Sequence, residues 1–316
     1  MIHAFALTGP TASGKTSISL KIAKALDCEI ICLDSMQIYK KMDIGTAKAT
    51  KDEQSIVKHH MLDFLSPTEN FSAKAYKELA MKVARDISSR GKTPLFVGGT
   101  GLYLSTMIRP DVEEAPESDP EYRRNIEKDL DTEEKRIALW ERLRQIDPLS
   151  AENVHYNNTR RVIRALEIYD ATGKTKSYFD ALTREKNKEI SFTHITLDFH
   201  ERENLYARIN ERVDAMLDEG LLKEVKSLYD DGLLGEQTTA SQAIGYKEML
   251  LVLRSEATLP EATEKLKQAT RNYAKRQLTW FRNMEGSIPV FMDDESKAMR
   301  DGNEVFEECI RIFRNK

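Results

Sequence analysis

The sequence predicts an α/β protein built on a parallel sheet, and three observations indicate this fold. A short apolar run at residues 3–8 leads into a glycine-rich loop and then into a helical pattern. Two more short apolar runs, 29–33 and 94–97, each end at a turn of polar or glycine residues. A long helical pattern lies between those two runs, at residues 72–90. Short buried runs that alternate with helices are typical of parallel sheets with crossover helices.

Residues 9–16 read Gly-Pro-Thr-Ala-Ser-Gly-Lys-Thr and fit the phosphate-loop pattern G-x-x-x-x-G-K-[ST]. The strand-like run before the loop and the helix expected at residues 16–26 are the context that this motif requires. The loop N–H groups and the helix N-terminus favour bound anions, Lys15 supplies a cation, and the Thr16 hydroxyl is the expected magnesium ligand. We therefore predict a P-loop NTPase-like core that binds a polyphosphate, without knowing from the loop alone which one.

Composition limits the classes of protein that remain. The chain has 316 residues, a net charge of −4 and three cysteines. This length favours about two domains, and this charge argues against a protein that coats nucleic acid by charge alone. An odd cysteine count does not predict a disulfide framework. We see neither an apolar run long enough to cross a membrane nor a signal peptide, so we expect a cytoplasmic protein without a membrane partner.

Two turns are expected at the edge of the sheet that carries the phosphate loop. Asp34 follows the strand at 29–33, and Gly98-Gly99-Thr100-Gly101 follows the strand at 94–97. Ligands of open α/β sheets bind beyond the carboxyl ends of the strands, so Asp34 is a candidate site residue; it is equally well explained as a turn or cap residue. A phosphate-hydrolysing motor usually places an aspartate at the second turn, and its absence weakens an ATPase interpretation.

A helical insertion is expected within the α/β core. The stretch 110–121 has three prolines and six acidic residues, which predicts a linker, and 183–191 predicts a return linker. Residues 193–199 alternate with a period of two and predict a strand that re-enters the sheet. We therefore expect a core made of residues 1–111 and 193–316, helical in its C-terminal region, and an insertion domain at 112–192.

Three helical patterns carry testable side-chain assignments. The helix at 72–90 is expected to bury Ala75, Leu79, Val83 and Ile87. A helix at 157–170 places Arg160, Arg161 and Arg164 on the side opposite its apolar residues. Within a long helix at 260–285, the stretch 271–282 has four basic residues, no acidic residue and interleaved aromatic rings. Such a stretch suits a looped nucleic acid; a solvated basic face with the rings in the core is the other interpretation.

Together these motifs resemble one family, the tRNA dimethylallyltransferases or tRNA isopentenyltransferases. Besides the phosphate loop, the matching stretches are Asp-Ser-Met-Gln-Ile-Tyr at 34–39, Met-Asp-Ile-Gly-Thr-Ala-Lys at 42–48, His-His-Met-Leu-Asp at 59–63, Gly-Gly-Thr-Gly-Leu-Tyr at 98–103, Ala-Ile-Gly-Tyr-Lys-Glu at 243–248 and the helix segment 271–282. They occur in the family's order over nearly the whole chain. Because no cysteine–histidine finger follows, we expect a bacterial-type member.

The resemblance implies transfer of a dimethylallyl group from its diphosphate to N6 of the adenine 3′-adjacent to the anticodon of tRNA, with Mg²⁺ as cofactor on Thr16. It assigns catalytic roles to Lys15, Asp34, Thr100 and Arg123, with Asp34 as the base. The residues expected to bind the diphosphate are Gly9, Pro10, Thr11, Ala12, Ser13, Gly14, Lys15 and Thr16. Those expected to contact the tRNA are Asp34, Ser35, Met36, Gln37, Thr100, Arg123, Asn158, Arg160, Arg161, Arg164, Arg271, Lys275 and Arg282. Met36 departs from the residue that many members carry. We expect a monomer.

Two other functions are compatible with the phosphate loop. A small-molecule kinase would explain the loop but neither the basic aromatic helix nor the Gly-Gly-Thr-Gly turn, and ATP turnover without tRNA would identify it. A non-catalytic RNA-binding module would not need Lys15, Thr16 and Asp34 together. A guanine-nucleotide switch is disfavoured because no Asn-Lys-x-Asp element is present; Asn187-Lys188 continues with Glu189-Ile190.

Overall fold

The fold was analysed in a computed structural model, which describes residues 1–110, 115–116, 119–182, 187–235 and 238–315. The chain forms two compact units. One unit contains Met1–Ile108 together with Glu189–Lys316, and the other contains Arg109–Lys188. The expected linkers at 110–121 and 183–191 fall partly outside the described residues. Each unit is considered below by itself.

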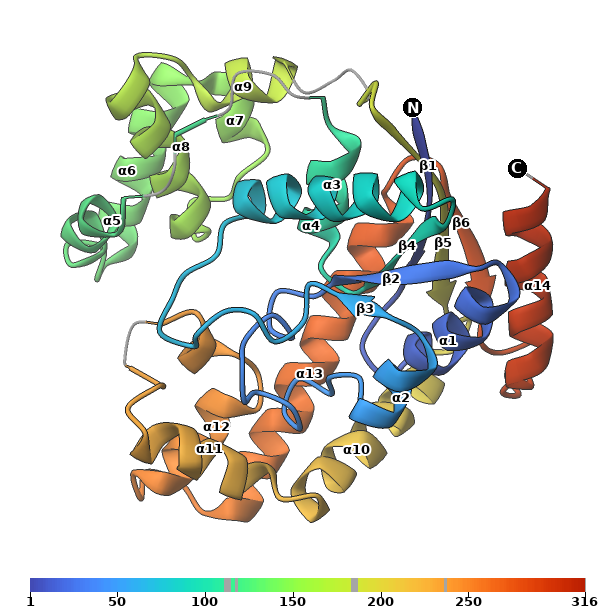
Figure 1. The fold of residues 1–316 in the computed structure, drawn as a ribbon. Helices are drawn as coiled ribbons and strands as arrows, with labels where there is room; N and C mark the ends of the chain where they lie inside the picture. The colour runs from blue at the N-terminus through green and yellow to red at the C-terminus, as the bar shows by residue number, and fades with distance from the viewer. Residues whose placement is uncertain (111–114, 117–118, 183–186, 236–237, 316) are drawn as a thin grey trace. The chain divides into compact units, whose positions relative to one another are not determined.

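The first unit is built on a six-stranded sheet in the order β3-β2-β4-β1-β5-β6 (Figure 1). All of its strand pairs are parallel. The strands are β1 (Ile2–Thr8), β2 (Cys28–Leu33), β3 (His59–His60), β4 (Thr93–Gly98), β5 (Ile190–Asp198) and β6 (Ser287–Phe291). Together with the helices described next, this sheet confirms the predicted α/β class, and β5 re-enters the sheet beside β1 as expected.

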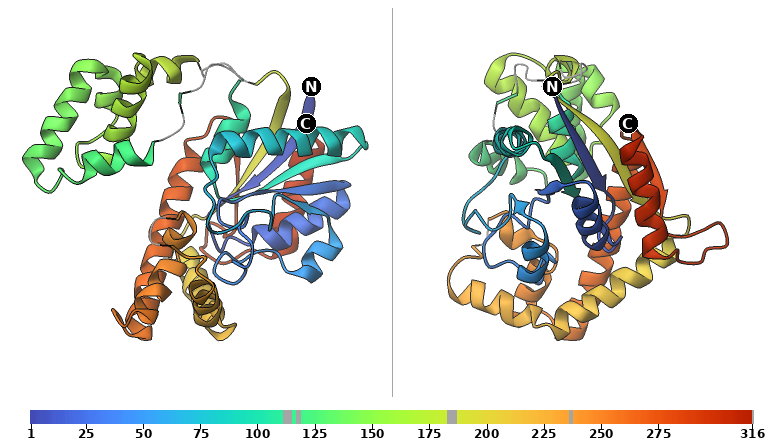
Figure 2. Two further views of the ribbon diagram at one scale, coloured as in Figure 1. Left: turned by 60° about the vertical axis from the view of Figure 1, so that its left-hand side comes forward. Right: turned by 45° about the vertical axis from the view of Figure 1, so that its right-hand side comes forward.

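Helices cover both faces of this sheet (Figure 2). The four that pack most directly on it are α1 (Lys15–Ala25), α3 (Ala73–Ser89), α4 (Gly101–Ile108) and α14 (Gly302–Arg314). Apolar side chains of α1 and α14 form one buried cluster with the sheet, and those of α3 and α4 form another. The central strands are therefore buried on both sides, which explains why their sequences are almost continuously apolar.

Four further helices of the first unit share a core away from the sheet: α10 (Arg202–Asp218), α11 (Leu221–Asp230), α12 (Tyr246–Leu253) and α13 (Leu259–Arg282), with a short 3₁₀ turn at Ala240–Gln242. Helices α10 and α13 also contribute to the cluster on the sheet, whereas α2 (Lys51–Ile56) buries no side chain. Ile38, Tyr39 and Met42, from the loop after β2, are buried among the apolar residues of α11 to α13. This packing fixes the loop that begins at Asp34.

The second unit is entirely helical in its described part. Its helices are α5 (Pro120–Glu127), α6 (Glu133–Ile146), α7 (Pro148–Glu152), α8 (Thr159–Thr172) and α9 (Lys176–Leu182). A small core joins α6, α7 and α8 through Leu143, Ala151, Val162, Ala165 and Leu166. The apolar side of α8 thus faces inward, as its sequence pattern predicts.

Two expectations need correction. Strand β6 was not expected from the sequence. Its five residues include a proline, and it pairs with β5 at the edge of the sheet, where a missing N–H is tolerated. On α3, the predicted stripe is confirmed at Ile87, which is buried, but is wrong at Leu79, which is exposed; Tyr76, Ala80 and Ala84 are buried instead. The Tyr76 hydroxyl donates to the backbone oxygen of Cys32 at 2.9 Å, which places this ring rather than Leu79 against the sheet.

Candidate active site

The three loops singled out in the sequence begin side by side at one edge of the sheet. Gly98 lies opposite Thr8 in one ladder and opposite Leu33 in the other. The chain leaves these three strand ends into the phosphate loop, the Asp34 loop and the Gly98–Gly101 turn. The parallel register therefore brings together residues that are up to 90 positions apart in the sequence without any further device.

The phosphate loop has a backbone that only certain residues tolerate. Gly9 has a φ of 148°, and a Cβ there would lie 2.8 Å from the Leu197 oxygen. Gly14 has a φ of 86° directly before α1. The Lys15 ammonium donates to the backbone oxygens of Gly9, at 2.9 Å, and Pro10, at 2.6 Å. Lys15 therefore lies within its own loop, where a bound phosphate would offer its oxygens as alternative acceptors.

Two arginines of α10 border the phosphate loop, and the sequence analysis missed both. The Arg208 guanidinium donates to the Ala12 oxygen at 2.8 Å. The Nε of Arg212 is buried and has no hydrogen-bond partner among the described residues. A buried donor without an acceptor is costly in a native structure. The i, i+4 spacing of these arginines, beside the apolar stripe of Leu205 and Ile209, is the signal that could have identified them.

Lys15 and Asp34 have mutually dependent charge states. The pKa of Lys15 is lowered to about 7, mainly by burial and to a smaller extent by repulsion from Arg212. The negative charge of Asp34 raises this pKa and so offsets part of the shift. Burial also raises the pKa of Asp34 above its ordinary value. Backbone N–H groups, Lys15 and Arg212 limit this shift. A carboxyl whose pKa is raised, next to cations that stabilise its ionised form, is suited to accept a proton.

Asp34 also shapes its own loop. Its Oδ1 accepts the N–H groups of Met36, at 2.8 Å, and Gln37, at 3.3 Å. The turn-capping interpretation of Asp34 is thus correct for this oxygen. It does not exclude a chemical role, because the carboxylate also lies within electrostatic range of Lys15 and Arg212. The cap holds the carboxylate in one orientation at the edge of the sheet.

Thr100 joins the second turn to the Asp34 loop. Its Oγ1 accepts the N–H of Ser35 at 3.1 Å, and its own N–H donates to the Leu33 oxygen at 2.9 Å. Tyr273 of α13 lies beside Thr100 and Asp34; burial and the charge of Asp34 raise the pKa of its hydroxyl. The side chain of Thr100 therefore links two loops of the site, in addition to any role that it has in the reaction.

Helix α13 packs directly on the glycine turns. Gln277 is buried and bonds both loops: its Oε1 accepts the Thr11 N–H and its Nε2 donates to the Gly99 oxygen, each at 2.9 Å. A Cβ on Gly101 would lie 2.3 Å from the ring of Trp280. The glycines after β4 are thus required by the close approach of α13. The sequence pattern of this turn does not reveal α13 as its neighbour.

Residues of other stretches that resemble the family, at 42–48 and 243–248, lie close to the loop that begins at Asp34. The amide of Gln37 donates to the backbone oxygens of Thr46, at 3.1 Å, and Ala47, at 3.2 Å. Glu224 of α11 accepts three consecutive backbone N–H groups, those of residues 43–45, and the Tyr246 hydroxyl. Met36 is half-buried against the cluster of α11 to α13. These residues keep the loop after β2 in a fixed conformation.

The basic residues of α13 are in different environments. Arg282 forms a two-pronged ion pair with the buried Asp198, with N–O distances of 2.7 and 2.8 Å. Arg271 donates to Asn210 of α10 at 2.7 Å. Lys275 and Trp280 are exposed, whereas Phe281 is buried in the core. The interpretation with aromatic rings in the core is thus correct for Phe281 and not for Trp280.

In the second unit, Glu167 organises two of the predicted arginines. It is buried and pairs with Arg123, at 3.3 Å, and Arg164, at 2.8 Å. Burial disfavours its charge, but hydrogen bonds from Arg164 and from the Asp119 backbone still hold its pKa below the ordinary value. Arg160 and Arg161 are exposed and form no ion pair with any residue of the described ranges. Asn158, at the start of α8, is exposed as well.

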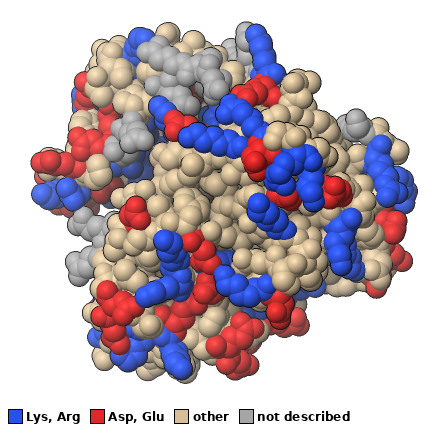
Figure 3. All heavy atoms as spheres, viewed as in Figure 1, with Lys and Arg blue, Asp and Glu red and all other residues tan. Residues whose placement is uncertain are grey.

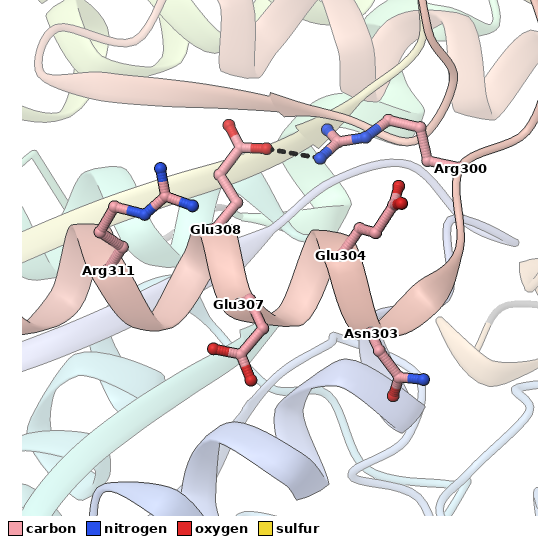
Figure 4. A pocket seen from close by; sticks show the side chains of 6 residues that line it. All are labelled: Arg300, Asn303, Glu304, Glu307, Glu308 and Arg311. Atoms are coloured by element: carbon pink, nitrogen blue, oxygen red, sulfur yellow. Dashed lines mark ion pairs between the residues drawn. The ribbon is translucent and has the colours of Figure 1, made fainter.

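On the face drawn in Figure 3, the described basic and acidic side chains are interspersed and form no single basic field that would by itself mark a binding site. A hollow on α14 is lined by Arg300, Asn303, Glu304, Glu307, Glu308 and Arg311 (Figure 4). Its charges are mixed, Arg300 pairs with Glu308 at 2.8 Å, and none of the residues discussed above lines it. The edge of the sheet therefore remains the candidate site.

Known proteins were compared with this chain. The family described as IPP transferase matches residues 37–284. A tRNA dimethylallyltransferase of Anoxybacillus flavithermus is 48% identical over 301 residues, which is 95% of this chain and 93% of the relative. The chain belongs to the tRNA dimethylallyltransferase family. A relative of the same name from Bacillus velezensis is 47% identical over 308 residues, covering 96% of this chain and 95% of its own.

Solved structures of this family share the fold. The tRNA isopentenylpyrophosphate transferase of Bacillus halodurans is 40% identical, with a TM-score of 0.72 over 100% of this chain and 96% of that one. A eukaryotic dimethylallyltransferase that acts on tRNA is 29% identical, with a TM-score of 0.76 over 94% of this chain and 75% of that one. The family and the P-loop NTPase-like fold are thus confirmed, and neither the kinase nor the non-catalytic alternative is supported.

The residues at this edge of the sheet could hold a magnesium ion only together with other ligands. Thr16 lies in the first turn of α1 and its side chain is partly exposed, so its hydroxyl can act as a ligand. Within the part of the chain that the structure describes, no group of three His, Cys, Asp or Glu side chains could hold a metal. Magnesium often uses one or two protein oxygens and completes its shell with phosphate oxygens and water. The residues present thus fit an ion that binds together with a diphosphate.

Proposed function

We propose that this chain transfers a dimethylallyl group from dimethylallyl diphosphate to N6 of the adenine 3′-adjacent to the anticodon of tRNA. The observation that carries this proposal is the juxtaposition of a phosphate loop with Asp34 and Thr100 on three neighbouring strand ends. Such an arrangement provides a place for a diphosphate and, beside it, a carboxylate that can accept a proton. We further propose that the chain acts as a monomer.

The first half of the reaction breaks the allylic C–O bond of the donor. Its electron pair leaves with the diphosphate, on which negative charge grows. The phosphate-loop N–H groups, Lys15 and Arg212 surround the position of this charge, and preorganised donors of this kind stabilise a transition state more than a ground state. Thr16 would hold the magnesium ion, which would neutralise further charge on the leaving diphosphate.

The second half forms the C–N bond. The exocyclic amine of adenine is a weak nucleophile and carries a proton that must leave as the bond forms. Asp34 would accept a hydrogen bond from N6 and take this proton. Its raised pKa, set mainly by burial, makes it a stronger base than a solvated aspartate. The backbone N–H groups on Oδ1 keep the carboxylate in place while the charge changes.

The tRNA would be bound by residues of both units. Arg160 and Arg161 present exposed guanidinium groups on α8, and Lys275 presents an ammonium on α13. Exposed cations of this kind bind phosphates, so they contribute affinity for the nucleic acid rather than sequence specificity. Arg123 of the second unit would also contact the tRNA. The target base must leave its stack before it can reach the site.

Mass spectrometry tests the proposed function directly. The purified protein is incubated with dimethylallyl diphosphate, magnesium chloride and unmodified tRNA, and the nucleosides of the anticodon loop are then analysed. We expect one adenosine, 3′-adjacent to the anticodon, to gain a dimethylallyl group. Consumption of ATP in the presence of a small acceptor, with no modified adenosine, would contradict the proposal.

A further inference from the structure

We infer that Gln277 is a positioning residue of the transfer reaction: its buried amide sets the register between the phosphate loop and the turn that carries Thr100. This inference rests on the proposed function and adds a residue to it. Neither the phosphate-loop motif nor the chemistry of the reaction requires a glutamine at this place. Two hydrogen bonds of the Gln277 amide, and the glycine that faces it, point to this role.

The two hydrogen bonds fix the orientation of the Gln277 amide. The Thr11 N–H can only donate, so it requires Oε1; the Gly99 oxygen can only accept, so it requires Nε2. Both distances are 2.9 Å, and the side chain is 5% exposed. A buried amide with a defined partner at each end is a rigid connection, because either loop can move only by leaving a buried polar group unpaired.

The absence of a side chain at Gly99 leaves space for the Gln277 amide. A Cβ on Gly99 would lie 2.1 Å from Gln277 Nε2, and its next contacts would be at 3.3 Å, to the same amide, and at 3.5 Å, to the Gly9 oxygen. The backbone angles of Gly99 are not in the left-handed region. The absence of a side chain at Gly99 is thus explained by Gln277 rather than by backbone conformation.

The connection matters because the two loops would hold different substrates. Thr11 belongs to the loop proposed for the donor diphosphate. Gly99 precedes Thr100, which holds the Asp34 loop through Ser35 at 3.1 Å and so lies on the acceptor side. The distance between the breaking C–O bond and the attacking amine therefore depends on the relative position of these loops. Misplacement by about 1 Å can cost about a hundredfold in rate.

The test uses Gln277→Met, which keeps the volume and removes both hydrogen bonds. Gln145→Met is the matched control, because Gln145 is an exposed glutamine within a helix, α6. Dimethylallyl transfer, binding of inorganic pyrophosphate and melting temperature are measured for each. We expect Gln277→Met to lose about 10- to 100-fold in kcat, with the KM for donor and the affinity for pyrophosphate changed less than about threefold. The control should match the wild type.

A double-variant cycle tests the direct contact between the two residues. Gly99→Ala should lower kcat by at least as much as Gln277→Ala, because its Cβ displaces the amide. Since the new methyl group meets no other atom closer than 3.5 Å, the double variant Gly99→Ala/Gln277→Ala should be no slower than Gln277→Ala alone. Losses that simply multiply would show that the two positions act independently and would overturn the inference.

Two further outcomes are decisive. A Gln277→Met protein that melts at a lower temperature but keeps its kcat per folded molecule would assign the residue to stability alone and overturn the inference. A kcat that is unchanged along with the melting temperature would do the same. Wild-type protein that binds pyrophosphate but never modifies tRNA would instead contradict the proposed function, so the two failures can be told apart.

Discussion

The lysine and arginine side chains that we assign to the site differ between the two units in their burial and in their partners. Lys15, Arg208 and Arg212 converge from two helices on one loop and are at least partly buried. Arg160 and Arg161 follow one another on a single helix, are exposed, and have no ion-pair partner within the described residues. Burial lowers the pKa of Lys15 and of Arg212 in the first group; the second group is solvated. We therefore expect different tasks of these two groups: chemistry for Lys15 and the arginines of the phosphate loop, and affinity for tRNA for Arg160 and Arg161.

The largest effect in this comparison is expected at Asp34. Asp34→Asn keeps an oxygen for the Met36 and Gln37 N–H groups, so the loop should hold its shape. It removes the base, and general-base catalysis is typically worth about 10²–10⁴-fold. Single-turnover rates should fall by that factor while tRNA affinity and melting temperature stay close to the wild type. A near-wild-type rate in the folded variant would remove Asp34 from the mechanism.

The next largest effects concern the donor. Lys15→Ala, Thr16→Ala and Arg212→Met each remove a group proposed to act on the diphosphate. Hydrogen bonds to charged groups contribute about 1.5–3 kcal/mol, so each variant should lose roughly 10- to 100-fold in kcat/KM for the donor. Filter binding should find tRNA affinity almost unchanged. Equal losses of donor and tRNA affinity would contradict the assignment of these residues to the diphosphate.

A pH effect follows from the environment of Lys15. The pKa of its ammonium is lowered to about 7 by burial and by Arg212, and a bound diphosphate would raise it. Protonated Lys15 binds the anion better, so affinity should be flat below pH 7 and should fall above it, by at most about tenfold per pH unit. Calorimetry of pyrophosphate in buffers of different ionisation enthalpy should show proton uptake at pH 8.

The control for this effect is Lys15→Arg, whose side chain stays charged throughout. Titration of pyrophosphate itself contributes equally to both proteins and cancels in their difference. An identical pH profile for the wild type and Lys15→Arg would mean that Lys15 does not titrate in this range.

The smallest effect is expected in the second unit. Arg160→Ala/Arg161→Ala removes two solvated cations and should weaken tRNA binding several-fold at moderate salt. The log–log salt slope should flatten by about one unit or less for each lost phosphate contact. Arg164→Ala is a poor substitute, because it leaves the buried Glu167 with fewer partners and should lower the melting temperature. An unchanged salt slope in the double variant would exclude these arginines from the tRNA interface.

The sequence predicted the architecture of the first unit well because local patterns specify it. The apolar runs at β1, β2 and β4 are almost fully buried strands, and the phosphate-loop motif fixes the turn that follows β1. The edge strand β6 was missed because five residues with a proline carry little pattern of their own. The displaced stripe on α3 shows that a tyrosine with a hydrogen-bond partner can replace a leucine in the core.

The candidate site was predictable only where its residues adjoin strand ends. Asp34 and Thr100 each follow a strand, so the parallel register placed them together. Arg212 and Gln277 lie on helices far along the chain, and their approach to the phosphate loop depends on how α10 and α13 pack. The ion pair of Arg282 with Asp198 likewise depends on tertiary structure, which helical spacing does not reveal.

The central claim is that the chemistry takes place at the edge of the sheet, whereas exposed cations such as Arg160 and Arg161 on α8 contribute affinity for tRNA. Its most direct test is a side-by-side measurement of tRNA affinity and of single-turnover transfer at saturating tRNA, for Asp34→Asn and for Arg160→Ala/Arg161→Ala. We expect the two variants to differ in which quantity they lose. Asp34→Asn should lose rate but keep affinity, and the double arginine variant should lose affinity but keep rate. If both variants lose rate and affinity in the same proportion, this claim is wrong.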